Sequence, residues 1–177
     1  MSTGTAQAYA RAVHAIAEAE DAADVVGAEL ASIADALAAD AEAGRRLSDR
    51  QLPVEQRLRL LDGGILATAH PATRAALAML ISAERIGHLG DVVTAFSERS
   101  ASEAGRTYAE VQVAHPLSDE QTAALQSALE RATGTELAMR VVVDPAVVGG
   151  VRARVGDTVI DGSVSRRLSQ LRTRMNA

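Results

Sequence analysis

Hydrophobic residues recur with the period of an α-helix from residue 5 to about residue 106. Pro53 and Pro71 stand where the first turn of a helix tolerates proline, and Gly87 and Gly90 mark a break before the last helical segment. The pattern predicts a bundle of five or six short helices with short connections. Its apolar stripes are Val26, Leu30, Ile33 and Leu37, then Val54, Leu58, Leu61 and Ile65, then Leu89, Val92 or Val93, and Phe96.

The hydrophobic period changes after Gly105, where residues 107 to 113 alternate as a half-buried strand does. Ser118, followed three residues later by Gln121, is a capping-box signal that opens a helix, and residues 137 to 143 form the next strand. A strand, helix and strand of this length predict a parallel pair with a right-handed crossover. We therefore place a boundary near residue 105, between domains 1–105 and 106–177.

A β-hairpin is predicted from the turn residues that follow this strand. Asp144 is extended because it precedes Pro145, and the glycines at 149–150 provide a flexible or bulged point where another strand begins. Residues 151–155 alternate between apolar side chains and arginine, and the Gly-Asp pair at 156–157 predicts a tight turn. The chain then returns through Val159 and Ile160.

An amphipathic helix is predicted to end the chain. Ser163 is a natural N-cap, and Asp161 places negative charge near the positive end of the helix. Together these elements predict an α+β protein, mostly α, with an N-terminal bundle of five to six helices and a small mixed α/β domain that carries a hairpin and a final helix. The helix has Val164, Leu168, Leu171 and Met175 in one stripe and Arg166, Arg167, Arg172 and Arg174 outside it.

The glycine pair, the R-x-R strand, the GD-x-VIDGS turn and the arginine-rich helix resemble the C-terminal signature of the delta subunit of F-type ATP synthase. This family includes the mitochondrial oligomycin-sensitivity-conferring protein. Residues 9–13 look like the opening helix of the family, and residues 114–121 look like the entry to its second domain, so the resemblance spans nearly the whole chain. The signature positions are Asp144, Gly149, Gly150, Gly156, Asp157, Asp161, Gly162, Ser163 and Leu168.

The resemblance implies a stator subunit without an active site, on the cytoplasmic face of the bacterial cell membrane. In the family, the helical domain receives the N-terminal helix of an alpha subunit between its first and fifth helices. The second domain holds the C-terminal region of the b subunit of the peripheral stalk. The groove for the alpha subunit would involve Tyr9, Ala12, Val13, Ala75, Ala76, Met79 and Ala83.

Two helical segments have more apolar surface than one core contact requires. Residues 71–85 are apolar nearly all round, and the first helix has an alanine row beside its larger apolar stripe. A face of small residues lets another helix approach closely, which favours a docking surface. The alternative is that both helices lie at the centre of their own bundle.

Composition removes most catalytic chemistry from the 177-residue chain. All 18 basic residues are arginine and there is no cysteine, so lysine Schiff bases, thiolate nucleophiles and cysteine metal sites are excluded. The four histidines lack metal-ligand spacing, and no nucleophile elbow occurs. We therefore expect no enzyme activity and no cofactor. The chain contains 37 alanines and only 2% aromatic residues, which predicts a core of small contacts between closely packed helices.

The formal charge of −5 is unevenly distributed along the chain. Residues 1–39 carry one arginine and six acidic residues, residues 40–137 carry ten and fourteen, and residues 138–177 carry seven and three, so the segments have charges of −5, −4 and +4. The basic end leaves open an alternative, a helical adaptor or an arginine-rich regulator that binds nucleic acid. The acidic total, and the lack of an exposed aromatic set beside the arginines for base stacking, argue against nucleic-acid binding. No stretch of about 18 apolar residues occurs, so we expect no direct insertion into a membrane.

Overall fold

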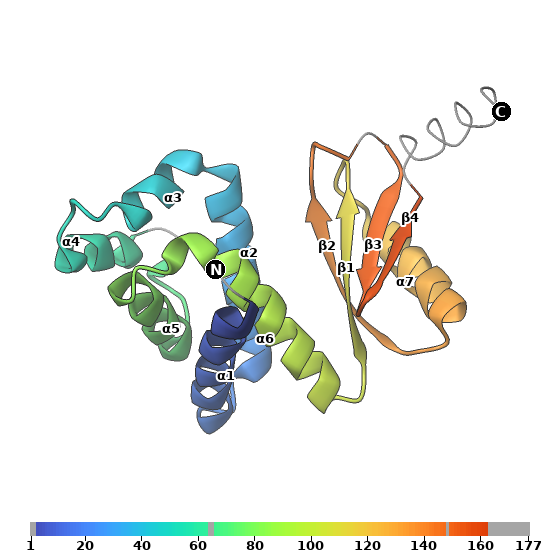
Figure 1. Cartoon of the computed structure of the whole chain (residues 1–177), viewed down its shortest axis with the longest axis horizontal. Helices are drawn as coiled ribbons and strands as arrows, with labels where there is room; N and C mark the ends of the chain where they lie inside the picture. Colours follow the sequence, from blue (N-terminus) through green and yellow to red (C-terminus); the bar gives the residue numbers. More distant parts are fainter. Residues whose placement is uncertain (1–2, 64–65, 148, 163–177) are drawn as a thin grey trace. The chain divides into compact units, whose positions relative to one another are not determined.

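A computed structural model describes residues 3–63, 66–147 and 149–162, apart from the side chain of Leu61. The chain divides into two compact units, residues 1–100 and 101–177. The division falls inside one helix, α6, a few residues before the change of hydrophobic period in the sequence. Figure 1 shows the helices of the first unit and the sheet of the second. Among the described residues, no helix has the combination of length and hydropathy that a membrane span requires.

The first unit is the predicted bundle of α-helices. The helix that opens with Pro71 follows the expected rule, because its first residue needs no hydrogen-bond partner for an N–H group. The described elements are α1 (Thr3–Ala19), α2 (Ala23–Ala39), α3 (Ala41–Ser48), α4 (Val54–Arg59), the 3₁₀ turn η1 (Leu60–Asp62), α5 (Pro71–Ser82), the 3₁₀ turn η3 (Ile86–His88) and α6 (Leu89–Glu103).

The core of this helical unit is built from small aliphatic side chains around one aromatic ring. Phe96 is 2% exposed, and a Cβ added to Gly27 on α2 would lie 3.0 Å from its ring. Glycine at position 27 therefore lets α2 pack closely on Phe96. The other buried members include Val13, Val26, Leu30, Ile33, Leu47, Ala76, Leu77, Leu80, Ile81, Ile86, Leu89, Val92 and Val93.

The stripe predicted around residues 54–65 differs from the observed packing. Val54 and Leu58 are only half-buried, whereas Arg57 is 1% exposed and is the most buried side chain of α4. The helix ends at Arg59 and continues as a 3₁₀ turn, so the long apolar stripe that the sequence suggested does not form over one continuous helix. The described residues do not include Ile65 or the side chain of Leu61.

Helix α5 ends earlier than the sequence predicts, at Ser82 instead of Arg85. Glu84 adopts the left-handed conformation with φ of 56°. The Arg85 N–H donates to the carbonyl of Leu80 at 2.7 Å, and the Glu84 N–H donates to that of Ile81 at 3.0 Å. These two bonds form a Schellman motif, which satisfies the last carbonyls of the helix without a glycine.

The second unit is the predicted mixed α/β domain. It contains β1 (Thr107–Val113), α7 (Asp119–Thr133), β2 (Leu137–Val143), β3 (Val151–Val155) and β4 (Thr158–Asp161), with the strands in the order β2-β1-β3-β4. Strands β1 and β2 are parallel, while β1 with β3 and β3 with β4 are antiparallel. The expected capping box is present, since Ser118 accepts from the Gln121 N–H and the Gln121 side chain accepts from the Ser118 N–H.

Alternation along β1 separates a core face of the sheet from a polar face. Ala109, Val111 and Val113 are buried with Leu129 of α7, and α7 covers this face in Figure 1. Side chains at the intervening positions point to the opposite face because strand periodicity is two. That face carries Tyr108, Glu110 and Gln112 of β1 with Arg140 of β2 and Arg152 and Arg154 of β3, as the register shows.

The turn of the predicted hairpin has two residues, since Val155 pairs with Thr158 across it. Gly156 has φ of 53°, and Asp157 is not among the residues with positive φ, as in a type II′ turn. Gly149 and Gly150 also have positive φ, of 67° and 83°. The fold class, the parallel pair and the hairpin are thus confirmed.

Other signature positions make local contacts at the ends of the strands. The Asp144 carboxylate accepts from the Ala146 N–H at 2.9 Å, and Asp161 lies opposite Arg152 in the sheet. The Gly162 N–H donates to the carbonyl of Val151 at 2.9 Å. Ser163, Leu168 and the predicted final helix lie outside the described residues.

A carboxylate fixes the start of β2. One oxygen of Glu130 on α7 accepts from the Gln126 side chain at 3.0 Å and from the Leu137 N–H at 3.2 Å. The hydrogen bond from Gln126, together with that from the Leu137 backbone, lowers the pKa of Glu130. The helix and the strand are therefore joined by bonds that the ionised form of Glu130 makes best.

Candidate functional site

Helix α1 has an apolar surface that its own core does not use. Ala6, Ala10, Val13 and Ala17 are buried. A separate row of small residues is exposed beside this stripe, and Ile16 is 37% exposed at its edge. Burial alone therefore does not account for the apolar character of the helix. The exposed row consists of Ala8, Ala12, Ala15 and Ala19.

Helix α5 shows the same division between a buried and an exposed apolar face. Ala72, Ala76, Leu77, Leu80 and Ile81 are buried. The remaining face is formed by small or flexible apolar side chains, with Arg74 as its only charged member in the helix. Its apolar and small members are Pro71, Ala75, Ala78, Met79 and Ser82.

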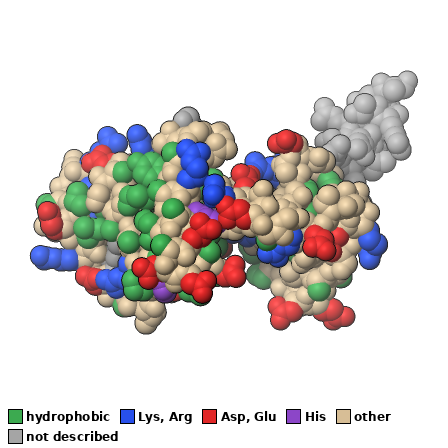
Figure 2. Space-filling view, turned by 90° about the horizontal axis from the view of Figure 1, so that it is seen from below, with side chains coloured by type: hydrophobic (Ala, Val, Ile, Leu, Met, Phe, Trp, Pro, Cys, Tyr) green, Lys and Arg blue, Asp and Glu red, His purple; other side chains and the backbone are tan. Residues whose placement is uncertain are grey.

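The two exposed faces belong to helices that contact each other within the helical unit. Tyr9 of α1 and Met79 of α5 are half-buried and both pack against the core. Figure 2 shows hydrophobic side chains gathered on one face of this unit. We use the name α1/α5 surface for the set Tyr9, Ala12, Ala75, Met79 and Ala83, which the sequence predicts to face a partner.

The structure places six of the seven predicted groove residues on α1 and α5 and the seventh, Ala83, directly after the end of α5, and it places them at different depths. Ala12, Ala75 and Ala83 are exposed, whereas Tyr9 and Met79 are half-buried. Val13 and Ala76 are 1% and 0% exposed and lie in the core beneath. A partner could therefore contact five of the seven residues, and the other two support the helices from inside.

A carboxylate that sequence reasoning missed fixes the start of α5. Glu29 on α2 accepts from the His70 N–H at 3.1 and 2.9 Å and from the Thr73 hydroxyl at 2.5 Å. Thr73 is 0% exposed. These bonds anchor the first turn of α5 to α2. The signal in the sequence was only that Pro71 opens a helix, and nothing local connects it to a residue 41 positions earlier.

The other end of α5 contacts a buried arginine that the sequence also did not reveal. The Arg57 guanidinium donates to the carbonyl of Leu47 at 3.5 Å, and its closest nitrogen lies 3.9 Å from a Glu84 oxygen. The second Glu84 oxygen lies 2.5 Å from Arg50. Glu84 thus offsets a charge that would be costly to bury alone.

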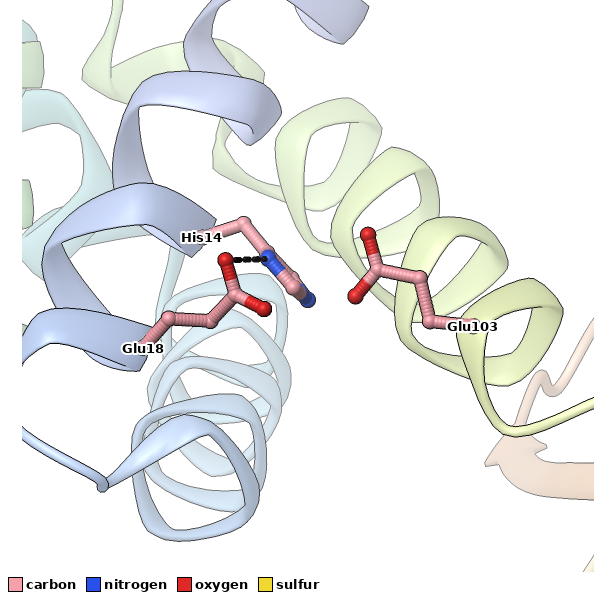
Figure 3. A group of neighbouring side chains, drawn as sticks. All are labelled: His14, Glu18 and Glu103. Carbon is pink, nitrogen blue, oxygen red and sulfur yellow. Dashed lines mark ion pairs between the residues drawn. The ribbon is translucent and has the colours of Figure 1, made fainter.

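His14 is a packed residue of α1. It is 2% exposed, its ring centroid lies 5.2 Å from that of Phe96, and its Nδ1 lies 3.4 Å from a carboxylate oxygen of Glu18. Figure 3 shows this pair one helical turn apart, and also draws Glu103, which belongs to the second unit. The imidazole fills a position in the core beside the only phenylalanine of the chain.

Comparisons with known proteins agree with the resemblance in the sequence. The family model described as ATP synthase delta (OSCP) subunit matches residues 5–175. The ATP synthase subunit delta of Myxococcus xanthus is 32% identical over 179 residues, covering 97% of this chain and 96% of that protein. The subunit of the same name from Rhizorhabdus wittichii is 35% identical over 168 residues, covering 92% of this chain and 89% of that protein.

A solved structure supports the fold independently. A chain in the cryo-EM structure of the Toxoplasma gondii mitochondrial ATP synthase hexamer matches with a TM-score of 0.61 and 23% identity, over 97% of each chain. At this identity the likeness concerns the fold alone. From the family model and the bacterial relatives together, the chain belongs to the ATP synthase delta (OSCP) subunit family.

Proposed function

We propose that this chain is the stator subunit that joins the catalytic head of the rotary ATP synthase to its peripheral stalk. The subunit would hold the head against rotation, so that torque changes the catalytic sites instead of turning the head. The observation that carries the proposal is the α1/α5 surface, an exposed apolar face on a chain of this family.

The chemistry of the surface fits a helix as the partner. Exposed alanines allow two helix backbones to approach closely, and Met79 can adapt its shape to a neighbour. In this proposal the N-terminal helix of an alpha subunit occupies the α1/α5 surface. The proposed contact depends on packing between apolar helix faces.

The second unit would hold the C-terminal region of the b subunit. This places the protein at the cytoplasmic face of the bacterial membrane, bound to the complex. The division of labour corresponds to domains 1–105 and 106–177. A fragment of residues 1–105 should then bind the alpha peptide alone.

The arginines on the polar face of the sheet do not favour the nucleic-acid alternative. Glu110 lies in register between Arg140 and Arg154, and Asp161 lies opposite Arg152. Phosphate binding would require an excess of positive charge on one face. The three arginines and two carboxylates named on this face leave a net charge of only +1, a small excess for phosphate binding.

Binding of a peptide from the alpha N-terminus tests the docking proposal. Ala12→Asp and Ala75→Asp each place a charge in the proposed apolar contact, where an unpaired charge costs several kcal/mol, and less if it reaches water. We expect at least about a tenfold loss of affinity by calorimetry. Ala38→Asp, at an exposed alanine of α2, is the matched control and should bind normally.

Thermal melting of the same variants separates binding from folding. Ala12 and Ala75 are exposed, so both aspartate variants should melt close to the unmodified protein. Normal peptide binding by both variants would contradict the assignment of the α1/α5 surface. Unfolding of both would show that these faces belong to the core.

A further inference from the structure

Helix α5 begins with an imidazole in the position that usually holds a hydroxyl or carboxylate. His70 is the N-cap, with φ of −55° and ψ of 143°, and its Nδ1 accepts a hydrogen bond from the Ala72 N–H at 3.2 Å. Serine, threonine, aspartate and asparagine are the common side chains at this position. The cap therefore depends on a lone pair of the His70 ring.

An imidazole nitrogen accepts a hydrogen bond only while it carries no proton. Histidine ordinarily changes its charge between about pH 5 and 8, where the hydroxyl and amide groups of other caps do not change. Protonation of Nδ1 replaces the acceptor with a donor and places two N–H groups against each other. His70 is only partly buried, so protons can reach the ring from solvent.

The charged groups around His70 act in opposite directions. Glu29 of α2 attracts a cation, but its oxygens already accept from the His70 N–H and the Thr73 hydroxyl. Arg74, on the next turn of α5, is paired with Asp62 of η1 at 2.6 Å. The positive end of the α5 dipole disfavours a cation at the N-cap. The Ala72 N–H therefore forms a hydrogen bond with the neutral His70 ring but cannot form one with the imidazolium.

We infer that His70 is a pH-responsive cap, whose protonation loosens the first turn of α5 and with it the α5 part of the α1/α5 surface. While Nδ1 is unprotonated, the cap is closed and the helix is anchored at both the imidazole and Glu29. Protonation of Nδ1 removes the bond at Ala72. Ala75 follows this turn directly and Met79 lies one turn further along α5, so the loosening reaches the Ala75 end of the surface first.

Amide exchange of the full chain tests the cap without any partner. We expect the Ala72 amide to exchange about fivefold faster at pH 5.5 than at pH 7.5, after correction for the intrinsic rate, as loss of one cap predicts. In His70→Asn the side chain stays an acceptor at both values, so the corrected rates should agree. His88→Asn, at a histidine beyond the other end of α5, should behave as the unmodified protein.

Three results would overturn the inference. They are equal protection of Ala72 at both pH values, the same pH response in His70→Asn, and a response abolished by His88→Asn.

Coupling of the cap to docking rests on the proposed function and needs a second measurement. Affinity for the alpha peptide should fall by about two- to fivefold between pH 7.5 and 5.5, and His70→Asn should remove most of this change. If the exchange result is as expected but neither the unmodified protein nor His70→Asn binds the peptide at pH 7.5, the docking proposal is wrong. The inference about the His70 cap is then still supported. If binding is strong but independent of His70, the cap does not regulate docking.

Discussion

The two units of the chain use apolar residues in different ways. In the α/β unit, alternate residues of β1 divide into a buried face and a polar face, so that Val111 is 0% exposed beside half-buried Gln112. In the helical unit, neighbouring alanines such as Ala75 and Ala76 lie on an exposed and a buried face of the same helix. Apolar character therefore marks the core along β1, whereas along α5 it does not.

The small size of alanine explains how the helical unit can keep the α1/α5 surface exposed to water. An alanine buries little area, so its exposure to water is cheap compared with that of leucine or phenylalanine. A helix that must meet a partner can therefore stay stable alone while it keeps an apolar face. In the sheet the alternation holds along β1, while Val143 of β2 and Val159 of β4 are 47% and 54% exposed.

Introducing a charge at each of two neighbouring alanines of α5 should have the largest and most unequal effects. Ala76→Asp should destabilise the protein by about 3 kcal/mol or more, because it buries a carboxylate at a position with 0% exposure. Ala75→Asp should change the free energy of unfolding by no more than about 0.5 kcal/mol. Urea denaturation measures both, and similar losses for the two variants would show that α5 has no free face.

The corresponding test in the sheet uses neighbouring residues of β1. Val111→Ala should cost about 2 kcal/mol because it removes buried methyl groups and leaves a cavity. Gln112→Ala, on the polar face, should stay within about 0.5 kcal/mol. Denaturant midpoints followed by circular dichroism distinguish the two. An equal effect at both positions would mean that both faces of β1 are buried to the same degree.

Glu84 tests how far the helical unit depends on one carboxylate. Glu84→Gln should cost about 1 to 2 kcal/mol, since it removes the charge opposite buried Arg57. Adding Arg57→Met should recover most of that loss, because no buried charge remains. Thermal melts of the single and double variants measure the loss of stability and its recovery. Additive losses in the double variant would contradict a coupling between the two residues.

The smallest expected effect is the acid response of Glu130 in the α/β unit. Its folded pKa is lowered from the usual value near 4.5, so its stabilising contribution is present above that value and is lost as the pH falls through the lower folded pKa. Glu130→Gln should therefore flatten the decline of stability below about pH 4.5. Melting temperatures between pH 3 and 7 measure this, and an unchanged profile would assign the acid response to other carboxylates.

Local patterns predicted the α/β unit well. The alternation of residues 107–113, the capping box at Ser118 and the turn at Gly156 all depend on neighbours within a few positions. Backbone geometry over a few residues determines each of these features, so a short segment of sequence is enough to predict them.

The helical unit was predicted in outline but not in its contacts. The helices and the buried stripes of α2 and α6 follow from periodicity, whereas the anchoring of α5 by Glu29 and the burial of Arg57 depend on residues far away in the chain. The early end of α5 arises because Glu84 tolerates a left-handed conformation, which sequence rules assign to glycine. Which alanines are exposed and which are buried depends on how the helices pack, so the sequence alone did not predict it.

The placement of the tyrosines gives each unit its own optical reporter. The chain has no tryptophan and only two tyrosines, of which Tyr9 lies on α1 and Tyr108 on β1. Ultraviolet fluorescence of a Tyr108→Phe variant therefore comes from the helical unit alone, and that of a Tyr9→Phe variant from the sheet alone. The order in which the units melt, and whether a bound peptide delays one of them, can be followed without attaching any dye.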